Sequence, residues 1–258
     1  MRTRLAWAAV TAAILAGGPV AAEDFQWRGR VAAGKTVEIK GVNGAIDATA
    51  ASGDEVEVTA TKKGRRSDPG SVRIEVVEHG EGVTICAVYP DVDGRRNECR
   101  AGDGGHMNTR DNDVSVHFTV RVPRGVAFAP RTVNGDVEAE GLEGDVSVRT
   151  VNGSVQVSTT GQADAQTVNG SIRASAGRAD WSGDAEFKTV NGSITVTLPS
   201  STSADVRAET VNGTIETDFA LTVSGRVSPR RLSGTIGGGG RSLEMETVNG
   251  SIHLKKSS

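Results

Sequence analysis

Hydrophobic and polar residues alternate one by one along much of the chain. The stretches 193–198, 205–209 and 243–246 place Ile, Val, Leu, Ala or Met at every second position, with Ser, Thr, Asp, Arg or Glu between them. A period of two with one apolar face is the pattern of a half-buried β-strand. No apolar stripe at a spacing of about 3.6 residues follows the first 22 residues, so we predict almost no helix.

The four letters TVNG recur six times between these strands. Successive asparagines of the phrase are separated by 18, 17, 22, 21 and 37 residues. A second turn at 141–144 divides the first interval, so each repeat holds two short strands. The segment GVNGAI at 41–46 is an early outlier, and RLSGTI at 231–236 resembles a degenerate copy inside the longest gap. A near-constant period predicts a stacked repeat architecture.

Two all-β architectures fit this repeat. Asn-Gly between alternating strands is a strong hairpin signal, so a meander or β-sandwich is the alternative. The full phrase, however, returns once per two strands, and a meander gives no reason for that. We therefore predict a single-chain parallel β-solenoid, resembling a β-helix, with coils of roughly 17–22 residues. The predicted structural corners are Asn134, Gly135, Asn152, Gly153, Asn169, Gly170, Asn191, Gly192, Asn212, Gly213, Asn249 and Gly250.

Each letter of the corner has an expected role. Stacked asparagine side chains can hydrogen-bond along a ladder, and glycine is expected to supply a left-handed backbone angle. Inward positions are small, such as Ala163 and Ala165, with Phe187, Phe219 and Met245 as larger fillers. The core should therefore be thin, and stability should come from many stacked coils.

The chain divides into a leader and one β-repeat domain. Residues 1–22 carry Arg2 and Arg4, a short apolar run and small residues before Glu23, which predicts a cleaved signal peptide. Residues 23–258 form the domain: an irregular, capping β-section at 23–130, with a charged loop at 91–111, and the TVNG solenoid at 131–258. No later segment is apolar enough to span a membrane.

Charge and composition narrow the function classes. Loss of Arg2 and Arg4 with the leader takes the formal net charge from −3 to −5, which argues against nucleic acid as a partner. Aromatic residues make up only 3% of the chain, which disfavours a sugar-binding cleft lined by stacking platforms.

Several segments resemble a known family. They are NDVSVHFTVRVP at 112–123, the TVNG series, GTIGGGGRSLEMETVNGSIHL at 234–254 and VTICAVYP at 83–90. Together they are similar to the bacterial putative-adhesin family of β-strand-repeat envelope proteins, whose function is unknown. The resemblance covers most of the chain beyond the leader. It implies a repetitive all-β fold in the cell envelope and implies no active site.

The loop at 91–111 holds the only unusual side-chain chemistry. Cys86 and Cys99 are the sole cysteines of an exported chain, which predicts a disulfide that pins the loop. A zinc site that adds His79 or His106 is the alternative, although the spacing matches no familiar ligand pattern. The sequence DVDG at 91–94 has the start of a calcium loop but lacks its third ligand, so a solvated turn is expected.

An enzyme is the competing class of protein. Asp205, Arg207 and Glu209 share one face of a strand, as the catalytic groups of polysaccharide-cleaving β-helices do, but alternating charge is also ordinary on a solvated strand face. We expect no catalytic activity, metal or cofactor. A second feature is the residue three positions before each asparagine, because these residues form one column if the coils stack in register. Along the chain the column changes from basic to acidic: Arg131, Arg149, Gln166, Lys188, Glu209 and Glu246.

These observations predict a non-catalytic exported protein. Its expected role is a cell-envelope scaffold or adhesin-like binding module, in the periplasm or on the surface, with an unknown envelope protein or surface ligand as partner. The alternatives are a periplasmic envelope-stress or regulatory partner of a membrane protein and, second, a polysaccharide-active β-helix enzyme. The sequence leaves the oligomeric state and the handedness of the solenoid open.

Overall fold

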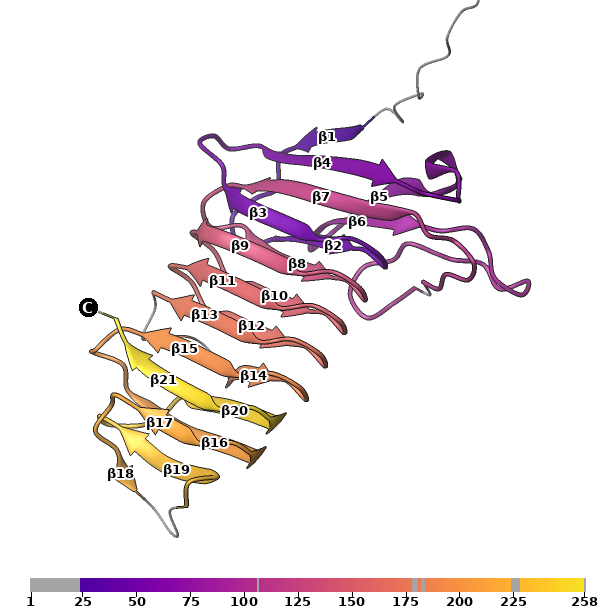
Figure 1. The fold of residues 1–258 in the computed structure, drawn as a ribbon. Helices are drawn as coiled ribbons and strands as arrows, with labels where there is room; N and C mark the ends of the chain where they lie inside the picture. Colours follow the sequence, from indigo (N-terminus) through magenta and orange to yellow (C-terminus); the bar gives the residue numbers. More distant parts are fainter. Residues whose placement is uncertain (1–23, 106, 178–180, 182–183, 224–227, 258) are drawn as a thin grey trace, which may run out of the picture.

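The computed structural model describes residues 24–105, 107–177, 181, 184–223 and 228–257. The predicted signal peptide lies outside these residues, and its limits and those of the two sections of the domain stay predictions. The described chain forms two long β-sheets that face each other, and the strands pass back and forth between them (Figure 1).

The bounds of the strands follow from the alternating segments. In spatial order, sheet A contains β1 (Phe25–Gly29), β4 (Val56–Lys63), β7 (Ser115–Val122), β3 (Ile46–Ala50), β9 (Val137–Leu142), β11 (Val155–Thr159), β13 (Ile172–Ala176), β15 (Ile194–Leu198), β21 (Ile252–Lys256) and β17 (Ile215–Thr217). Sheet B contains β18 (Thr222–Val223), β19 (Arg231–Ile236), β16 (Ala204–Asn212), β20 (Ser242–Asn249), β14 (Asp184–Lys188), β12 (Ala163–Gln166), β10 (Val146–Arg149), β8 (Ala127–Arg131), β2 (Thr36–Lys40), β6 (Gly82–Val88) and β5 (Arg73–His79).

The middle of the molecule is the predicted parallel β-solenoid. A coil consists of one strand of sheet B, a TVNG corner and one strand of sheet A. Equivalent strands of neighbouring coils pair in parallel; for example, β11 pairs with β13, and Val155 stands opposite Ile172. The hairpin-based alternative is therefore wrong for the TVNG repeats, because each Asn-Gly leads the chain from one sheet to the other.

The coils do not stack in the order of the sequence. The coil β20–β21, last in the chain, lies between β14–β15 and β16–β17, and pairs in parallel with both (Figure 1). At the other end, β2–β3 lies between β6–β7 and β8–β9. The early outlier GVNGAI thus contributes a coil of the stack.

Antiparallel strands cover both sheets at the N-terminal end of the solenoid and sheet B at the other end. β1 and β4 extend sheet A, β5 extends sheet B, and β18 and β19 close sheet B at the opposite end. The prediction of a degenerate coil at RLSGTI is wrong, because β19 runs antiparallel to β16 and Gly234 stands opposite Val206 within the strand pair. Such coverings protect the unpaired edge groups of a stack.

The core is a narrow layer of apolar side chains between the two sheets. Ala163, Ala165, Phe187, Phe219 and Met245 are buried, as the alternation predicts. Only one short 3₁₀ helix, η1 (Pro69–Ser71), occurs within the described residues. In that part of the chain, no helix has the length and apolar character to cross a membrane.

Candidate functional site

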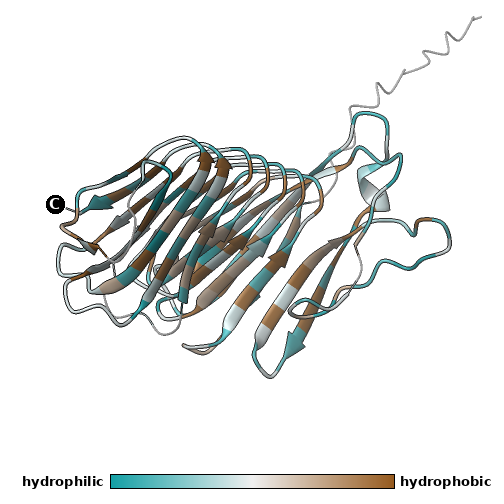
Figure 2. Ribbon diagram, turned by 90° about the horizontal axis from the view of Figure 1, so that it is seen from below, coloured by the Kyte–Doolittle hydropathy of each residue, from teal (hydrophilic) through white to brown (hydrophobic). Residues whose placement is uncertain are grey.

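The asparagines of the corners form one continuous ladder along an edge of the solenoid. Six side-chain hydrogen bonds join the asparagines of this ladder. In each of them the Nδ2 of one asparagine donates to the Oδ1 of its neighbour, at 2.7–2.8 Å. The corners follow one another as a row of parallel arcs in Figure 2. In spatial order the ladder contains Asn43, Asn134, Asn152, Asn169, Asn191, Asn249 and Asn212.

The threonine and the residue after glycine form two further rows. Thr167 is buried, and its hydroxyl donates to the carbonyl oxygen of Gly153 in the neighbouring coil at 2.9 Å. The hydroxyl of Ser171 accepts from the backbone N–H of Ser193 at 3.2 Å. Both contacts link one coil to the next, so these polar residues are needed in every coil for stacking.

The predicted role of the corner glycines is wrong. Gly44 is the only corner glycine with a positive φ, at 127°, among the described corners. At Gly170, an added Cβ would lie 2.0 Å from the carbonyl oxygen of Gly153, and the other TVNG corners show the same approach. Glycine is therefore required because neighbouring backbones come too close for any side chain.

The valine of the phrase is the exposed apolar member of the corner. Val133, Val151, Val168, Val190 and Val248 are all more than one-third exposed, whereas Val42 at the first corner is buried. These valines form a narrow apolar ridge beside the asparagine ladder.

The loop at 91–111 leaves the end of β6 and returns to the start of β7. A disulfide joins Cys86, at 0% exposure in β6, to Cys99 in the loop, with 5.7 Å between their Cα atoms. This bond excludes the zinc alternative built on two thiolates; His79 instead lies 3.1 Å from the Thr84 hydroxyl, and His106 is outside the described residues. Asp91–Gly94 is part of a turn in which Val92 and Arg95 exchange backbone hydrogen bonds.

The column of charged residues is continuous on the outer face of sheet B. In spatial order it runs Lys40, Arg131, Arg149, Gln166, Lys188, Glu246 and Glu209. The true order of coils adds Lys40 at the basic end and exchanges the last two residues. The change from basic to acidic along the stack is thus present in the fold. We call Lys40, Arg131 and Arg149 the basic row.

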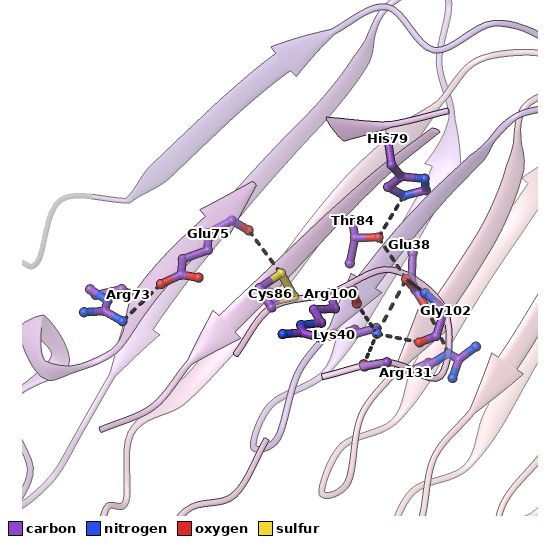
Figure 3. The surroundings of a disulfide bond; sticks show 12 residues. Glu38, Lys40, Arg73, Glu75, His79, Thr84, Cys86, Arg100, Gly102 and Arg131 are labelled. Atoms are coloured by element: carbon purple, nitrogen blue, oxygen red, sulfur yellow. Dashed lines mark hydrogen bonds and ion pairs between the residues drawn. A yellow bond between two sulfur atoms is a disulfide. The ribbon is translucent and has the colours of Figure 1, made fainter. Parts of the chain in front are cut away.

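The disulfide-bonded loop folds over the basic row, and Figure 3 shows this contact at Lys40 and Arg131. The Lys40 ammonium donates to the carbonyl oxygens of Arg100 and Gly102, at 2.5 and 2.6 Å, and to that of Gly104 at 3.2 Å. From the same segment, the Asp103 carboxylate pairs with Arg131 and, at 3.2 Å, with Arg149.

The buried carboxylate of Glu38 binds both the loop and the basic row. Glu38 accepts hydrogen bonds from the Thr84 hydroxyl and from the Gly102 backbone N–H, both at 2.9 Å, and pairs with Arg131 at 3.1 Å (Figure 3). Isolated buried charges are costly, so a group in this position needs such partners.

The pKa values at this contact follow from burial and pairing. Burial lowers the pKa of Lys40, although Glu38 partly opposes the shift. The hydrogen bond from Arg131 lowers the pKa of the exposed Asp103, and Arg149 adds to the shift. Asp103 is therefore ionised at neutral pH, which keeps both ion pairs in place.

Asp205, Arg207 and Glu209 lie on the outer face of β16 as predicted, but they are held by structural contacts. Asp205 accepts from the Thr235 hydroxyl at 2.9 Å, and Glu209 pairs with Arg207 at 2.9 Å and with Arg231 at 3.0 Å. Burial raises the pKa of Glu209, but the hydrogen bonds from these two arginines outweigh it and lower the pKa overall. A proton donor for glycoside cleavage needs a raised pKa instead. Among the described residues, no group of three or more His, Cys, Asp or Glu is placed to hold a metal ion.

A two-sheet β-solenoid with a repeated Thr-Val-Asn-Gly corner defines the class of protein. The family model Toastrack DUF4097 matches residues 106–255, which is more than half of the chain. The chain belongs to this family, and the match confirms the resemblance found in the sequence. No curated protein matches it.

Solved structures give a more distant likeness. A putative cell adhesion protein from Clostridium sporogenes is 12% identical, with a TM-score of 0.44, over 91% of this chain and 100% of that one. A putative adhesin from Bacteroides fragilis is 10% identical, with a TM-score of 0.25, over 91% of this chain and 97% of that one. One from Parabacteroides merdae is also 10% identical, with a TM-score of 0.23, over 92% and 97% of the two chains. At these identities and scores, the likeness supports no statement about function.

Proposed function

We propose that this chain is a non-catalytic, exported scaffold that presents the outer faces of its solenoid to a partner in the cell envelope. The observation that carries the proposal is a contrast between rows of the same coils. The corner row repeats asparagine in every coil, whereas the neighbouring outward row of sheet A changes at every coil: Asp47, Glu138, Gln156, Arg173, Thr195, His253 and Glu216.

Stacking explains the constant row but not the composition of the variable one. Corner residues contact the next coil, so a change there breaks hydrogen bonds between coils. Some outward strand residues also contact the next coil, as His253 does with Glu216 at 3.2 Å, but these contacts do not require the same residue in every coil, so the row is free to match a partner. A rigid stack with a varied polar face is typical of the extended binding surfaces of repeat proteins.

The export part of the proposal rests on the sequence of residues 1–22. It predicts a mature protein that begins at Glu23 and lies in the periplasm or on the cell surface. The mass of the protein isolated from the envelope fraction tests the cleavage, and an intact leader on all of the protein would contradict export by this route.

Protease accessibility tests the location. A tagged protein is expected to resist protease on intact cells if it lies in the periplasm and to be digested there if it lies on the surface. In both cases, cells with a permeabilised outer membrane should show digestion. Protection after permeabilisation, with digestion only after lysis of the inner membrane, would contradict the proposal.

Crosslinking tests the scaffold role. Photoreactive side chains at outward positions, such as Arg173 and His253, are expected to capture an envelope component. The matched control is the buried Ile194, which should capture nothing outside the chain. Equal capture from both positions, or none from the outward ones, would count against a binding face.

A further inference from the structure

The basic row on sheet B is occupied by a segment of the same chain, and the contacts are those that a foreign acidic peptide would make. We propose that the basic row is a docking site for an acidic peptide segment of a partner protein, with Arg100–Gly104 as its resident ligand. This inference rests on the scaffold function proposed above and names the partner class for one face.

The groups that recognise the resident segment indicate a peptide. Lys40 binds three backbone carbonyl oxygens, and the buried Glu38 binds a backbone N–H, so the surface contacts the main chain as well as the carboxylate. An anionic polysaccharide supplies carboxylates but lacks backbone amide groups in this arrangement. The ammonium and carboxylate beside one another therefore favour an extended peptide over other acidic polymers.

The charges at the site are incompletely matched. Lys40, Arg131 and Arg149 face two carboxylates, those of Glu38 and Asp103, which leaves an excess of one positive charge at the contact. Moreover, Arg131 and Arg149 both pair with the same oxygen, Oδ1, of Asp103. A peptide with two carboxylates would pair each arginine separately, which is the electrostatic advantage it has over the resident segment.

The Asp103 end of the resident segment is its more easily displaced part, whereas the contacts of Gly102 with the buried Lys40 and Glu38 are held more firmly. The side chains of Asp103 and Arg149 are 78% and 49% exposed, and exposed ion pairs contribute little to stability. Gly102 and Gly105, with φ of 64° and 83°, lie on either side of Asp103 and give the backbone freedom to bend. The disulfide at Cys99 holds the base of the loop, so the segment can leave without release of the rest.

The site has a defined extent. Beyond Arg149 the column continues with Gln166 and then Lys188, which pairs with Glu186 and with Glu244 at 3.4 Å. These carboxylates repel an acidic ligand, so the peptide should cover the three coils that carry the basic row and no more.

The test uses the full mature protein and two synthetic peptides. One peptide has the sequence Gly-Asp-Gly-Asp-Gly, and the control has asparagine in place of aspartate. D103N removes the carboxylate that pairs with Arg131 and Arg149 and so weakens the contact of the resident segment with the basic row. In fluorescence anisotropy at low salt, the D103N protein should therefore bind the acidic peptide roughly tenfold more tightly than the wild type does. Adding R149Q to D103N should remove the gain, whereas adding K255Q, on the outer face of sheet A, should leave it unchanged.

A second readout follows the displacement itself. The Gly102 amide, bonded to Glu38, should exchange its hydrogen faster in the wild type when the acidic peptide is added. Equal affinity of D103N and wild type, equal binding of the asparagine peptide, or dimerisation of D103N without peptide would overturn the proposal. Because these measurements use purified protein, they are independent of the export and location tests.

Discussion

The substitution Gly170→Ala tests why the corner contains glycine. The added Cβ would lie 2.0 Å from the Gly153 carbonyl oxygen and 2.8 Å from the Ser154 nitrogen. A carbon–oxygen contact needs about 3.3 Å, so the two coils must separate by about 1.3 Å at this corner. That movement breaks the Thr167 hydroxyl bond to Gly153 and the Asn169 amide bond to Asn152.

The cost of the substitution follows from these broken contacts. The backbone bonds from Gly153 N–H to Asn169 and from Asn169 N–H to Val151 join the same two coils, so up to four hydrogen bonds at about 1 kcal/mol each give a loss of about 3–4 kcal/mol in the free energy of unfolding. Urea unfolding followed by circular dichroism measures this loss. The control is Gly53→Ala, since nothing lies within 4 Å of a Cβ at that position, and it should change the free energy by less than about 0.5 kcal/mol.

A second variant separates close approach from backbone conformation. Asparagine tolerates left-handed backbone angles better than alanine does. If glycine served that conformation, Gly170→Asn would be clearly milder than Gly170→Ala. If close approach is the reason, both variants have a Cβ and are equally destabilised. A stable Gly170→Asn protein would refute close approach as the reason for glycine.

Four further predictions concern the ladder, the end of the chain, the disulfide and the acid response. Asn169→Ala removes two exposed side-chain hydrogen bonds and should cost about 1–2 kcal/mol, measured by urea unfolding; a change near zero would show that the ladder is not stabilising. Deleting residues 242–258 removes β20 and β21, which pair on both sides, so β16 and β17 lose their neighbours in the stack and the unfolding enthalpy in calorimetry should fall well below that of the full chain; a native-like transition would contradict the interleaved order. Reduction of the disulfide, whose cysteines are 13 residues apart, should cost about 3 kcal/mol in a thermal melt with and without a dithiol reductant, and an unchanged melt would contradict its pinning role. Hydrogen bonds from the Ser67 and Arg66 backbone lower the pKa of Asp113 to about 2, so its stabilising effect is complete above pH 4 and is lost as the pH falls towards 2; Asp113→Asn should flatten this part of the stability–pH curve, and parallel curves would contradict it.

Much of the fold could be predicted from local pattern, because stacking has strict local requirements. The alternation identifies the strands, and the constant period identifies coils. The disulfide follows from two cysteines in a chain that the sequence predicts to be exported. The hydroxyl rows were visible in the sequence as a threonine and a small polar residue at fixed positions, although their hydrogen bonds to the next coil were not predicted.

The order of the coils could not be predicted, for a physical reason. The corners at Asn212 and Asn249 have the same sequence, so each can stack on Asn191 with the same hydrogen bonds. The choice depends on the antiparallel pair β16–β19, which needs a free edge of sheet B, and on the connection at 237–241. The sequence predicts a degenerate corner at RLSGTI, where an antiparallel strand occurs, because only the asparagine distinguishes a corner from a strand interior.

The contact between the loop and the basic row could not be predicted from the sequence either. The sequence showed a column of changing charge and a pinned loop, but nothing linked Asp103 to Arg131 or Arg149. The link depends on Lys40, which joins the column only because β2 stacks on β8. GVNGAI was the available signal: it has the corner pattern, and three residues before its asparagine stands a lysine.

The interleaving of the coils at both ends limits how the protein can be built and lengthened. A ribosome or a secretion channel releases β16 and β17 before β20 and β21. In the folded stack, however, β20 and β21 lie between β14–β15 and β16–β17 and pair with both. The coils at this end of the stack therefore stay incomplete until β21 has emerged, so this part of the fold forms later than the coils up to β15. For the same reason a duplicated repeat added at either terminus would not lengthen the stack. New coils are accommodated only in the stretch between β8 and β15, where the order of the chain and the order in space coincide.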